Sequence, residues 1–102
     1  MSLYRFSPHA LDDLDALLYS LAERSGWDHS MDMEEKIYAA LDRIGRSPGI
    51  GHLRKDLIPH EVYFDYAKPY LILYRRDTRP VYILAILHGA RDIATIMQDR
   101  LP

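Results

Sequence analysis

Residues 87–92, Leu-His-Gly-Ala-Arg-Asp, hold the side chains best suited to chemistry. They end an apolar run that is typical of a strand, and their glycine permits a sharp exit from that strand. An imidazole and a guanidinium beside such a turn, here His88 and Arg91, suit recognition of a phosphate or a carboxylate. The alternative is structural: Arg91 and Asp92 form a cap and His88 packs nearby. The residues alone leave both interpretations open.

Other basic side chains lie in segments expected to be loops, turns or strand ends. They are Arg54 in a long loop, Lys68 in a turn and Arg75 near a strand end. Taken singly, such residues are most often solvated surface charges. The sequence has no Gly-rich phosphate loop, no Ser, His and Asp in a supporting motif, and no paired carboxylates at a predictable cleft. His88 and Arg91 are therefore the catalytic candidates, and we expect no cofactor.

Metal and thiol chemistry are not expected either. The chain has no cysteine, which excludes disulfides, thiolate nucleophiles and thiolate zinc sites. Its five histidines show no pair four residues apart, so we predict no metal site. The eight tyrosines lie mostly at strand positions, where packing explains tyrosine better than base stacking does.

The composition is that of an ordinary globular protein, and we expect one domain over residues 1–102. No apolar run approaches the roughly 20 residues of a membrane span, so we expect a cytoplasmic protein without a membrane partner. Residues 1–47 carry 5 Lys/Arg and 9 Asp/Glu, whereas residues 48–102 carry 8 and 6. With a formal net charge of −2, strong nonspecific affinity for nucleic acid is not expected.

The first half of the chain begins with a strand pattern and continues with helical spacing. Residues 3–6 alternate apolar and polar types, which predicts a short strand. Ser7 can cap a helix whose first position suits Pro8, and Gly26 is a suitable stop. The sequence therefore predicts one helix between Ser7 and Gly26.

A second helix should begin near Asp28 or Ser30 and end near Arg46. The link to the first helix is short, which predicts an antiparallel helical hairpin. Apolar residues at spacings of three and four define the expected core between hairpin and sheet. It contains Leu14, Leu18, Ile37, Leu41 and Ile44.

The second half carries strand patterns. Residues 48–59 are punctuated by Pro and Gly and predict a loop. Three β-rich runs follow at 60–66, 70–76 and 81–87, and the turn-like separators predict consecutive antiparallel hairpins. A short final helix is expected at 92–100. The predicted class is α+β: strand, two helices, three antiparallel strands and a C-terminal helix.

The last two predicted strands are apolar on both faces. The first of them sets Leu71 and Leu73 against Tyr70, Ile72 and Tyr74. The second sets Val81, Ile83, Ala85 and Leu87 against Tyr82, Leu84 and Ile86. A helical hairpin covers one face only, so the C-terminal helix, a partner protein or both must cover the other.

The order of elements resembles the ParE/RelE superfamily of toxins from type II toxin–antitoxin systems, also called plasmid stabilisation proteins. The matching stretches are Tyr-Arg-Phe-Ser-Pro-His-Ala at 4–10, leading to Asp-Leu at 13–14, Ser-Pro-Gly-Ile-Gly at 47–51, Tyr-Leu-Ile-Leu-Tyr-Arg at 70–75, and Ile-Leu-His-Gly-Ala-Arg-Asp at 86–92. They span nearly the whole chain, and the His-Gly-Ala-Arg-Asp ending resembles the ParE branch.

The resemblance implies a toxin that is neutralised by a cognate antitoxin. In this superfamily the antitoxin lays a C-terminal extension over the toxin's sheet and helices. For that contact we name Tyr70, Ile72 and Tyr74. A toxin homodimer and a toxin–antitoxin heterotetramer both remain open.

The resemblance also implies one of two targets. RelE-like members cut messenger RNA on the ribosome, whereas ParE-like members inhibit DNA gyrase and are not known to need catalytic residues. The residues available for target binding are Arg54, Lys68, Arg75, His88 and Arg91, and they do not match a full nuclease set. Because modest basicity suits ribosome docking poorly, we expect gyrase inhibition. Ribosome-dependent cleavage of messenger RNA and an inactive antitoxin-binding module are the alternatives.

Overall fold

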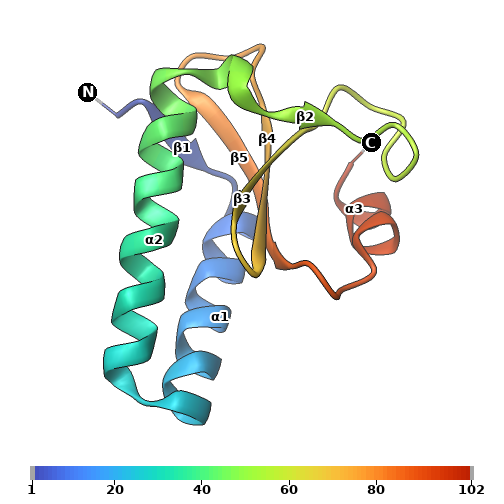
Figure 1. Ribbon diagram of the computed structural model, residues 1–102. Coiled ribbons are helices and arrows are strands. Elements are labelled where there is room, and N and C mark those ends of the chain that lie inside the picture. Colours follow the sequence, from blue (N-terminus) through green and yellow to red (C-terminus); the bar gives the residue numbers. More distant parts are fainter. Residues whose placement is uncertain (1, 102) are drawn as a thin grey trace.

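A computed structural model describes residues 2–101 as a central sheet with a helical hairpin on one side and a short helix on the other (Figure 1). The elements in chain order are β1 (Tyr4–Phe6), α1 (Pro8–Ser25), α2 (Trp27–Arg46), the 3-10 turn η1 (Pro48–Ile50), β2 (His52–Leu53), β3 (Tyr63–Ala67), β4 (Tyr70–Arg75), β5 (Val81–His88) and α3 (Ile93–Arg100). The predicted α+β class and the order of its main elements are confirmed. Among the described residues, no helix is long and apolar enough to cross a bilayer.

The sheet has five strands in the order β1-β5-β4-β3-β2. The predicted hairpins β3–β4 and β4–β5 are antiparallel, as expected. β1 instead pairs parallel with β5, with Tyr4 opposite Val81 and Phe6 opposite Ile83. The first strand is therefore held by the last one, and α1 leaves the sheet directly beside β5.

Both ends of α1 follow the predicted signals. The Ser7 hydroxyl accepts the Ala10 amide hydrogen at 3.0 Å and donates to the Leu84 carbonyl at 3.2 Å, so the cap also joins β5. Gly26 has φ of 89°, a conformation that favours glycine, and it alone separates α1 from α2. α2 therefore begins at Trp27, slightly earlier than predicted.

The segment predicted as a loop at 48–59 contains two short elements, η1 and β2. The Tyr74 hydroxyl donates to the Pro48 carbonyl at 2.7 Å and accepts the Gly51 amide hydrogen at 2.9 Å. These bonds hold the segment against β4, where β2 pairs with β3 as an edge strand. β3 begins at Tyr63, later than the predicted residue 60, because the preceding residues turn over the opposite face of the sheet.

The helical hairpin covers one face of the sheet and forms the larger core. Of the predicted core residues, Leu14, Ile37, Leu41 and Ile44 are buried there, and Leu18 packs against them partly buried. From the sheet, this core includes Tyr70, Ile72, Tyr74, Val81, Ile83 and Ile86. The predicted packing between hairpin and sheet is thus confirmed.

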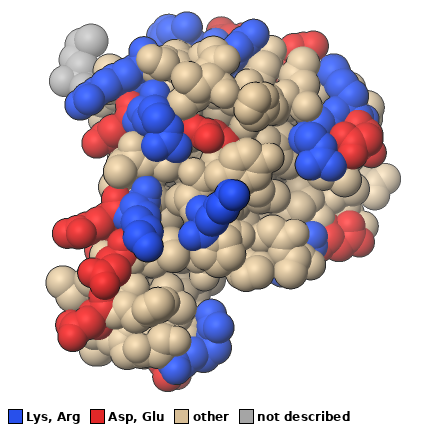
Figure 2. Space-filling view, in the orientation of Figure 1, with Lys and Arg blue, Asp and Glu red and all other residues tan. Residues whose placement is uncertain are grey.

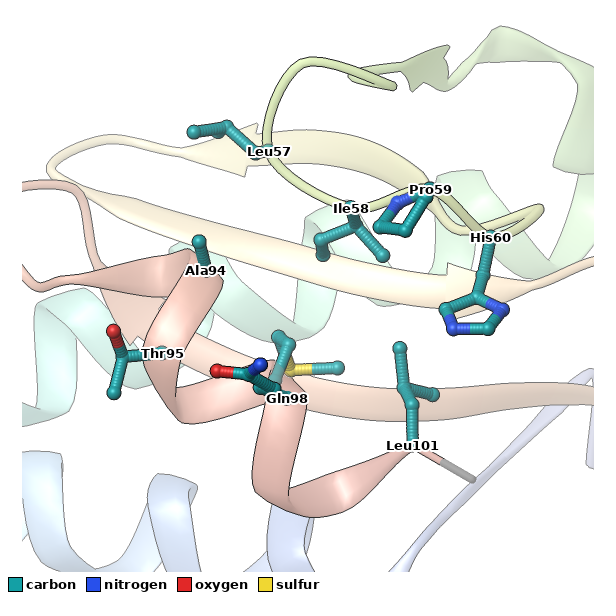
Figure 3. Close-up of a pocket in the computed structure, with 9 residues that line it drawn as sticks. Leu57, Ile58, Pro59, His60, Ala94, Thr95, Gln98 and Leu101 are labelled. Atoms are coloured by element: carbon teal, nitrogen blue, oxygen red, sulfur yellow. The ribbon is translucent and has the colours of Figure 1, made fainter.

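The opposite face of the sheet is covered by the chain itself. α3 and the loop before β3 supply Ile58, Val62, Ile93 and Met97, which pack on Phe64, Leu73, Ala85 and Leu87. The C-terminal helix is therefore one of the two expected covers. Figure 3 shows residues 57–60 facing α3 across this side of the molecule.

Strict alternation along β5 was the wrong expectation. The register with β4 shifts between Leu73 and Tyr74, so that Leu73 opposes Ala85 whereas Tyr74 opposes Ile83. Leu84 is the extra residue of this bulge, and an extra residue reverses the side to which later side chains point. Ala85 and Leu87 consequently face α3, while Ile86 joins Ile83 under the hairpin.

We predict that Tyr74→Phe lowers the free energy of unfolding by about 1–3 kcal/mol, because it leaves the Gly51 amide and the Pro48 carbonyl without their partner. Denaturant unfolding measures the effect. Tyr63→Phe is the matched control, since the Tyr63 hydroxyl bonds only the exposed Glu61. Equal losses in the two variants would contradict this account of the loop.

Candidate functional site

A cleft of about 300 Å³ lies between α1 and the C-terminal end of β5. His88 and Arg91 both line it, so the structure brings the two principal candidates together. The other lining residues are Asp13, Ala16, Leu17, Ser20, Arg24, Tyr70, Ile86 and Leu87. We call this the β5 cleft.

His88 is the last residue of β5 and is held by its neighbours on two sides. Its ring meets that of Tyr70 edge to face, with centroids 5.5 Å apart. Its Nδ1 accepts the Ala90 amide hydrogen at 3.0 Å. In the neutral imidazole the proton therefore resides on Nε2, which is left as a hydrogen-bond donor.

Gly89 makes the turn that follows His88. Its amide donates to the Pro69 carbonyl at 2.9 Å, and a Cβ at this position would lie 3.3 Å from the same oxygen. The turn before β4 and the exit from β5 thus pack closely. Lys68 lies exposed in the first of these turns and is not among the residues that line the β5 cleft.

The structure separates the roles of Arg91 and Asp92. Asp92 caps α3, because its carboxylate accepts both the amide and the hydroxyl hydrogen of Thr95, and these bonds lower the pKa of Asp92. Within residues 2–101, no carboxylate forms an ion pair with Arg91. The capping interpretation therefore holds for Asp92, while Arg91 stays available at the cleft.

Arg24 is a cleft residue that sequence reasoning missed. It lies in the last turn of α1, and its Nε donates to the Ser20 hydroxyl at 3.3 Å. In the described part of the chain it has no carboxylate partner at ion-pair distance. Spacing along α1 alone does not show that this arginine faces the end of β5.

Sequence reasoning also did not identify Asp13 as a partner of the C-terminal helix. Arg100 of α3 binds it with two bonds of 2.6 and 2.8 Å, and Asp13 also accepts the Ile86 amide hydrogen at 3.0 Å. The bond to Asp13 raises the pKa of Arg100. The negative charge of Asp13 is therefore balanced within the chain, and the β5 cleft keeps a positive character from its other arginines.

The remaining basic candidates lie apart from this cleft. Arg54 follows β2 and binds Asp56 with two bonds, of 3.0 and 2.9 Å. Arg75 ends β4 and binds Asp77 in the same way, which lowers the pKa of Asp77. β4 runs away from His88, so Arg75 lies at the other end of the sheet. The five predicted target-binding residues therefore do not form one site.

The three residues named for antitoxin contact lie in the core of the chain. Tyr70, Ile72 and Tyr74 are 5%, 0% and 0% exposed under the helical hairpin. The sequence showed that both sheet faces are apolar but not which one the hairpin covers. Ile72 and Tyr74 are thus out of a partner's reach while α1 and α2 stay in place, whereas Tyr70 also lines the β5 cleft.

A second cleft, of about 430 Å³, opens between residues 57–60 and α3 (Figure 3). No Asp, Glu, Lys or Arg lines it. Its polar side chains are His60 from the loop and Thr95 and Gln98 from α3. The β5 cleft is consequently the better candidate for a site with ionic chemistry.

We predict that Asp13→Asn lowers the free energy of unfolding by about 2–3 kcal/mol, because it leaves the largely buried Arg100 guanidinium without its charge partner. A double-mutant cycle with Arg100→Gln should give a clear coupling energy in denaturant unfolding. Arg75→Gln breaks an exposed pair and serves as control, with an expected loss below about 0.5 kcal/mol. Additive effects at Asp13 and Arg100 would contradict the prediction.

Comparison with known proteins agrees with the fold and the resemblance. The family model described as ParE toxin of type II toxin–antitoxin system, parDE, matches residues 4–93. Toxin ParE3 of Caulobacter vibrioides is 32% identical over 82 residues, which cover 80% of this chain and 81% of that protein. A solved chain of the chromosomal ParDE TA system from P. aeruginosa has a TM-score of 0.71 at 18% identity, covering 83% of this chain and 92% of that one. The chain therefore belongs to the ParE toxin family of type II toxin–antitoxin systems.

Proposed function

We propose that this ParE-family toxin inhibits DNA gyrase in the cytoplasm and that a cognate antitoxin holds it inactive. The family match over residues 4–93 carries the proposal, because resemblance to the ParE branch implies gyrase as the target. The match includes His88 and Arg91, so the β5 cleft lies within the matched region.

The chemistry of the β5 cleft supports binding more than RNA cleavage. Cleavage at a 2′-hydroxyl needs a base, an acid and cations that stabilise the developing phosphorane charge. The cleft offers His88 and two arginines, but its carboxylate, Asp13, is engaged by Arg100 and the Ile86 amide. Arg54 and Arg75 lie elsewhere and are paired. A surface that only binds a partner protein needs no side chain that transfers a proton.

The charge distribution supports a protein target over ribosomal RNA. The chain has a net charge of −2, and its acidic residues are concentrated in the half that forms the helical hairpin. Figure 2 shows carboxylates along the edge of the molecule formed by α2. A ribosome-binding surface must neutralise many phosphates, and an acidic hairpin opposes that.

The outer surface of the hairpin supplies an apolar surface for the antitoxin. Leu11, Trp27 and Met31 are 46%, 69% and 59% exposed, and Tyr19 and Tyr38 are exposed as well. In Figure 1 the Gly26 end of the hairpin extends past the sheet, so the sheet does not cover it. Exposed large apolar side chains concentrated on one element are typical of a protein contact.

Helical spacing places several of these side chains on one face of each helix. Leu11 and Leu18 share a face of α1, and Trp27, Met31 and Tyr38 share a face of α2. Burial and then the charges of Glu34 and Asp15 raise the pKa of Tyr38, which agrees with carboxylates of both helices near its ring. We call these five apolar residues and two carboxylates the hairpin face. Its chemistry suits an amphipathic antitoxin helix that carries Lys or Arg.

We predict that the purified protein inhibits DNA supercoiling by gyrase and that His88→Ala and Arg91→Ala each weaken inhibition at least about 10-fold, the size expected when a charged hydrogen bond is lost. Titration of the supercoiling reaction measures this, and thermal unfolding checks that each variant folds. Arg46→Ala removes a charge from the last turn of α2 and is the matched control.

Controlled expression in bacteria separates the alternatives. Growth arrest with a DNA-damage response agrees with gyrase inhibition. Prompt arrest of translation with cut transcripts would contradict it and indicate messenger RNA cleavage. Full growth with a folded protein would instead indicate an inactive antitoxin-binding module.

We predict that Trp27→Ala and Met31→Ala each weaken antitoxin affinity at least about 10-fold, since apolar anchors dominate such contacts. Calorimetry with the purified cognate antitoxin measures the change. Both side chains are exposed, so the variants should unfold at nearly the wild-type temperature. Leu53→Ala, an exposed apolar change on β2, is the control, and equal weakening by it would place the contact elsewhere.

A further inference from the structure

The β5 cleft presents hydrogen-bond donors from two different parts of the fold. Arg24 and Ser20 come from α1, and His88 and Arg91 come from the end of β5 and the turn after it. The Arg24 Nε donates to the Ser20 hydroxyl, which leaves the terminal nitrogens of that guanidinium without a hydrogen-bond partner within residues 2–101. The Nε2 of neutral His88 is a further donor.

The cleft also has an apolar lining. Ala16, Leu17 and Ile86 contribute to it, and Tyr70 adds an aromatic surface. A charge bound between such walls loses part of its water, so its attraction to the arginines is stronger than on an open surface. Because Arg100 already balances Asp13, the cleft has a surplus of positive charge for an incoming anion.

We propose that the β5 cleft binds a carboxylate side chain of an acidic segment on the target protein, and that Arg24 and Arg91 hold it from opposite walls. The inference rests on the proposed function, because it names the chemistry of the gyrase surface that the toxin recognises. Guanidinium groups match carboxylates with paired hydrogen bonds. The apolar walls suit a peptide in which an aliphatic residue neighbours the carboxylate.

A nucleic acid strand fits this cleft less well than an acidic peptide. A strand carries one charge at each nucleotide and requires a basic surface that continues along it. Outside the cleft lining, α1 carries the exposed carboxylates of Asp12, Asp15 and Glu23. The positive charge is therefore local, as a single carboxylate requires.

Arg24 is the residue that distinguishes this inference from the family resemblance. It lies outside every stretch that carries the resemblance, and it enters the site only because α1 packs beside β5. Its role is to set specificity for the anion. Its exposure also means that its replacement does not disturb the core.

The test uses the full-length, ¹⁵N-labelled protein and two short synthetic peptides, acetyl-Leu-Glu-Leu-Asp-amide and its neutral counterpart acetyl-Leu-Gln-Leu-Asn-amide. We expect the acidic peptide to shift the backbone resonances of Gly89, Ala90 and Arg91 and to bind at least 10-fold more tightly than the neutral one. Arg24→Ala and Arg91→Ala should each weaken the acidic peptide about 10-fold or more, whereas Arg46→Ala should not.

Three results would overturn the inference. Equal affinity for the two peptides would mean that the cleft binds apolar side chains and not carboxylates. Equal weakening by Arg46→Ala would mean that general charge, and not the cleft, attracts the peptide. A 20-base-pair DNA duplex that shifts the same resonances more strongly than the acidic peptide would assign the cleft to nucleic acid.

A supercoiling assay with the same variants tests the source of the carboxylate. Loss of gyrase inhibition by Arg24→Ala, with retained antitoxin affinity, supports a segment of the target. Retained inhibition with lost antitoxin affinity overturns that assignment. If the wild-type protein does not inhibit gyrase while the acidic peptide still binds through Arg24, the proposed function fails and the carboxylate site stands.

Discussion

The fold depends on how the chain supplies hydrogen-bond partners to the edge of β5 beyond the end of β1. The parallel partner stops at Phe6, so the Leu84 carbonyl and the Ile86 amide have no strand beside them on that edge. Ser7, the N-cap of α1, and Asp13 within α1 bond these two groups, and Arg100 reaches Asp13 from α3. Unpaired backbone groups at a buried edge are costly, so these side chains set where α1 and α3 lie.

The candidate site follows from that same edge. Once Ser7 and Asp13 hold α1 along β5, the next turns of the helix bring Ser20 and Arg24 to the level of His88. The ion pair of Asp13 with Arg100 also removes the negative charge that would otherwise neutralise the arginines. One set of contacts thus closes the sheet edge, anchors the C-terminal helix and leaves the cleft positive.

The division of charge agrees with two contacts at different places on the molecule. The hairpin face joins apolar side chains with the carboxylates of Asp15 and Glu34, whereas the β5 cleft joins apolar walls with arginines. Because the two surfaces have opposite charge, each favours a partner of the complementary charge. Each also disfavours the partner that suits the other surface. The contacts proposed for the antitoxin and for the target therefore differ in charge.

Local signals in the sequence determined the α+β class and the helical hairpin with its Ser7 cap and Gly26 stop. They also identified His88 and Arg91 as candidate functional residues. These features arise from spacing and turn chemistry within a few residues. The tertiary structure decided the rest: the parallel β1–β5 pair, the Leu84 bulge that turns Ile86 toward the hairpin, and the face on which Tyr70, Ile72 and Tyr74 are buried. It also brought Arg24 to His88 and Arg100 to Asp13. Such pairings join segments far apart in the chain. Their energy depends on burial and on hydrogen bonds to buried backbone groups, which no local pattern encodes.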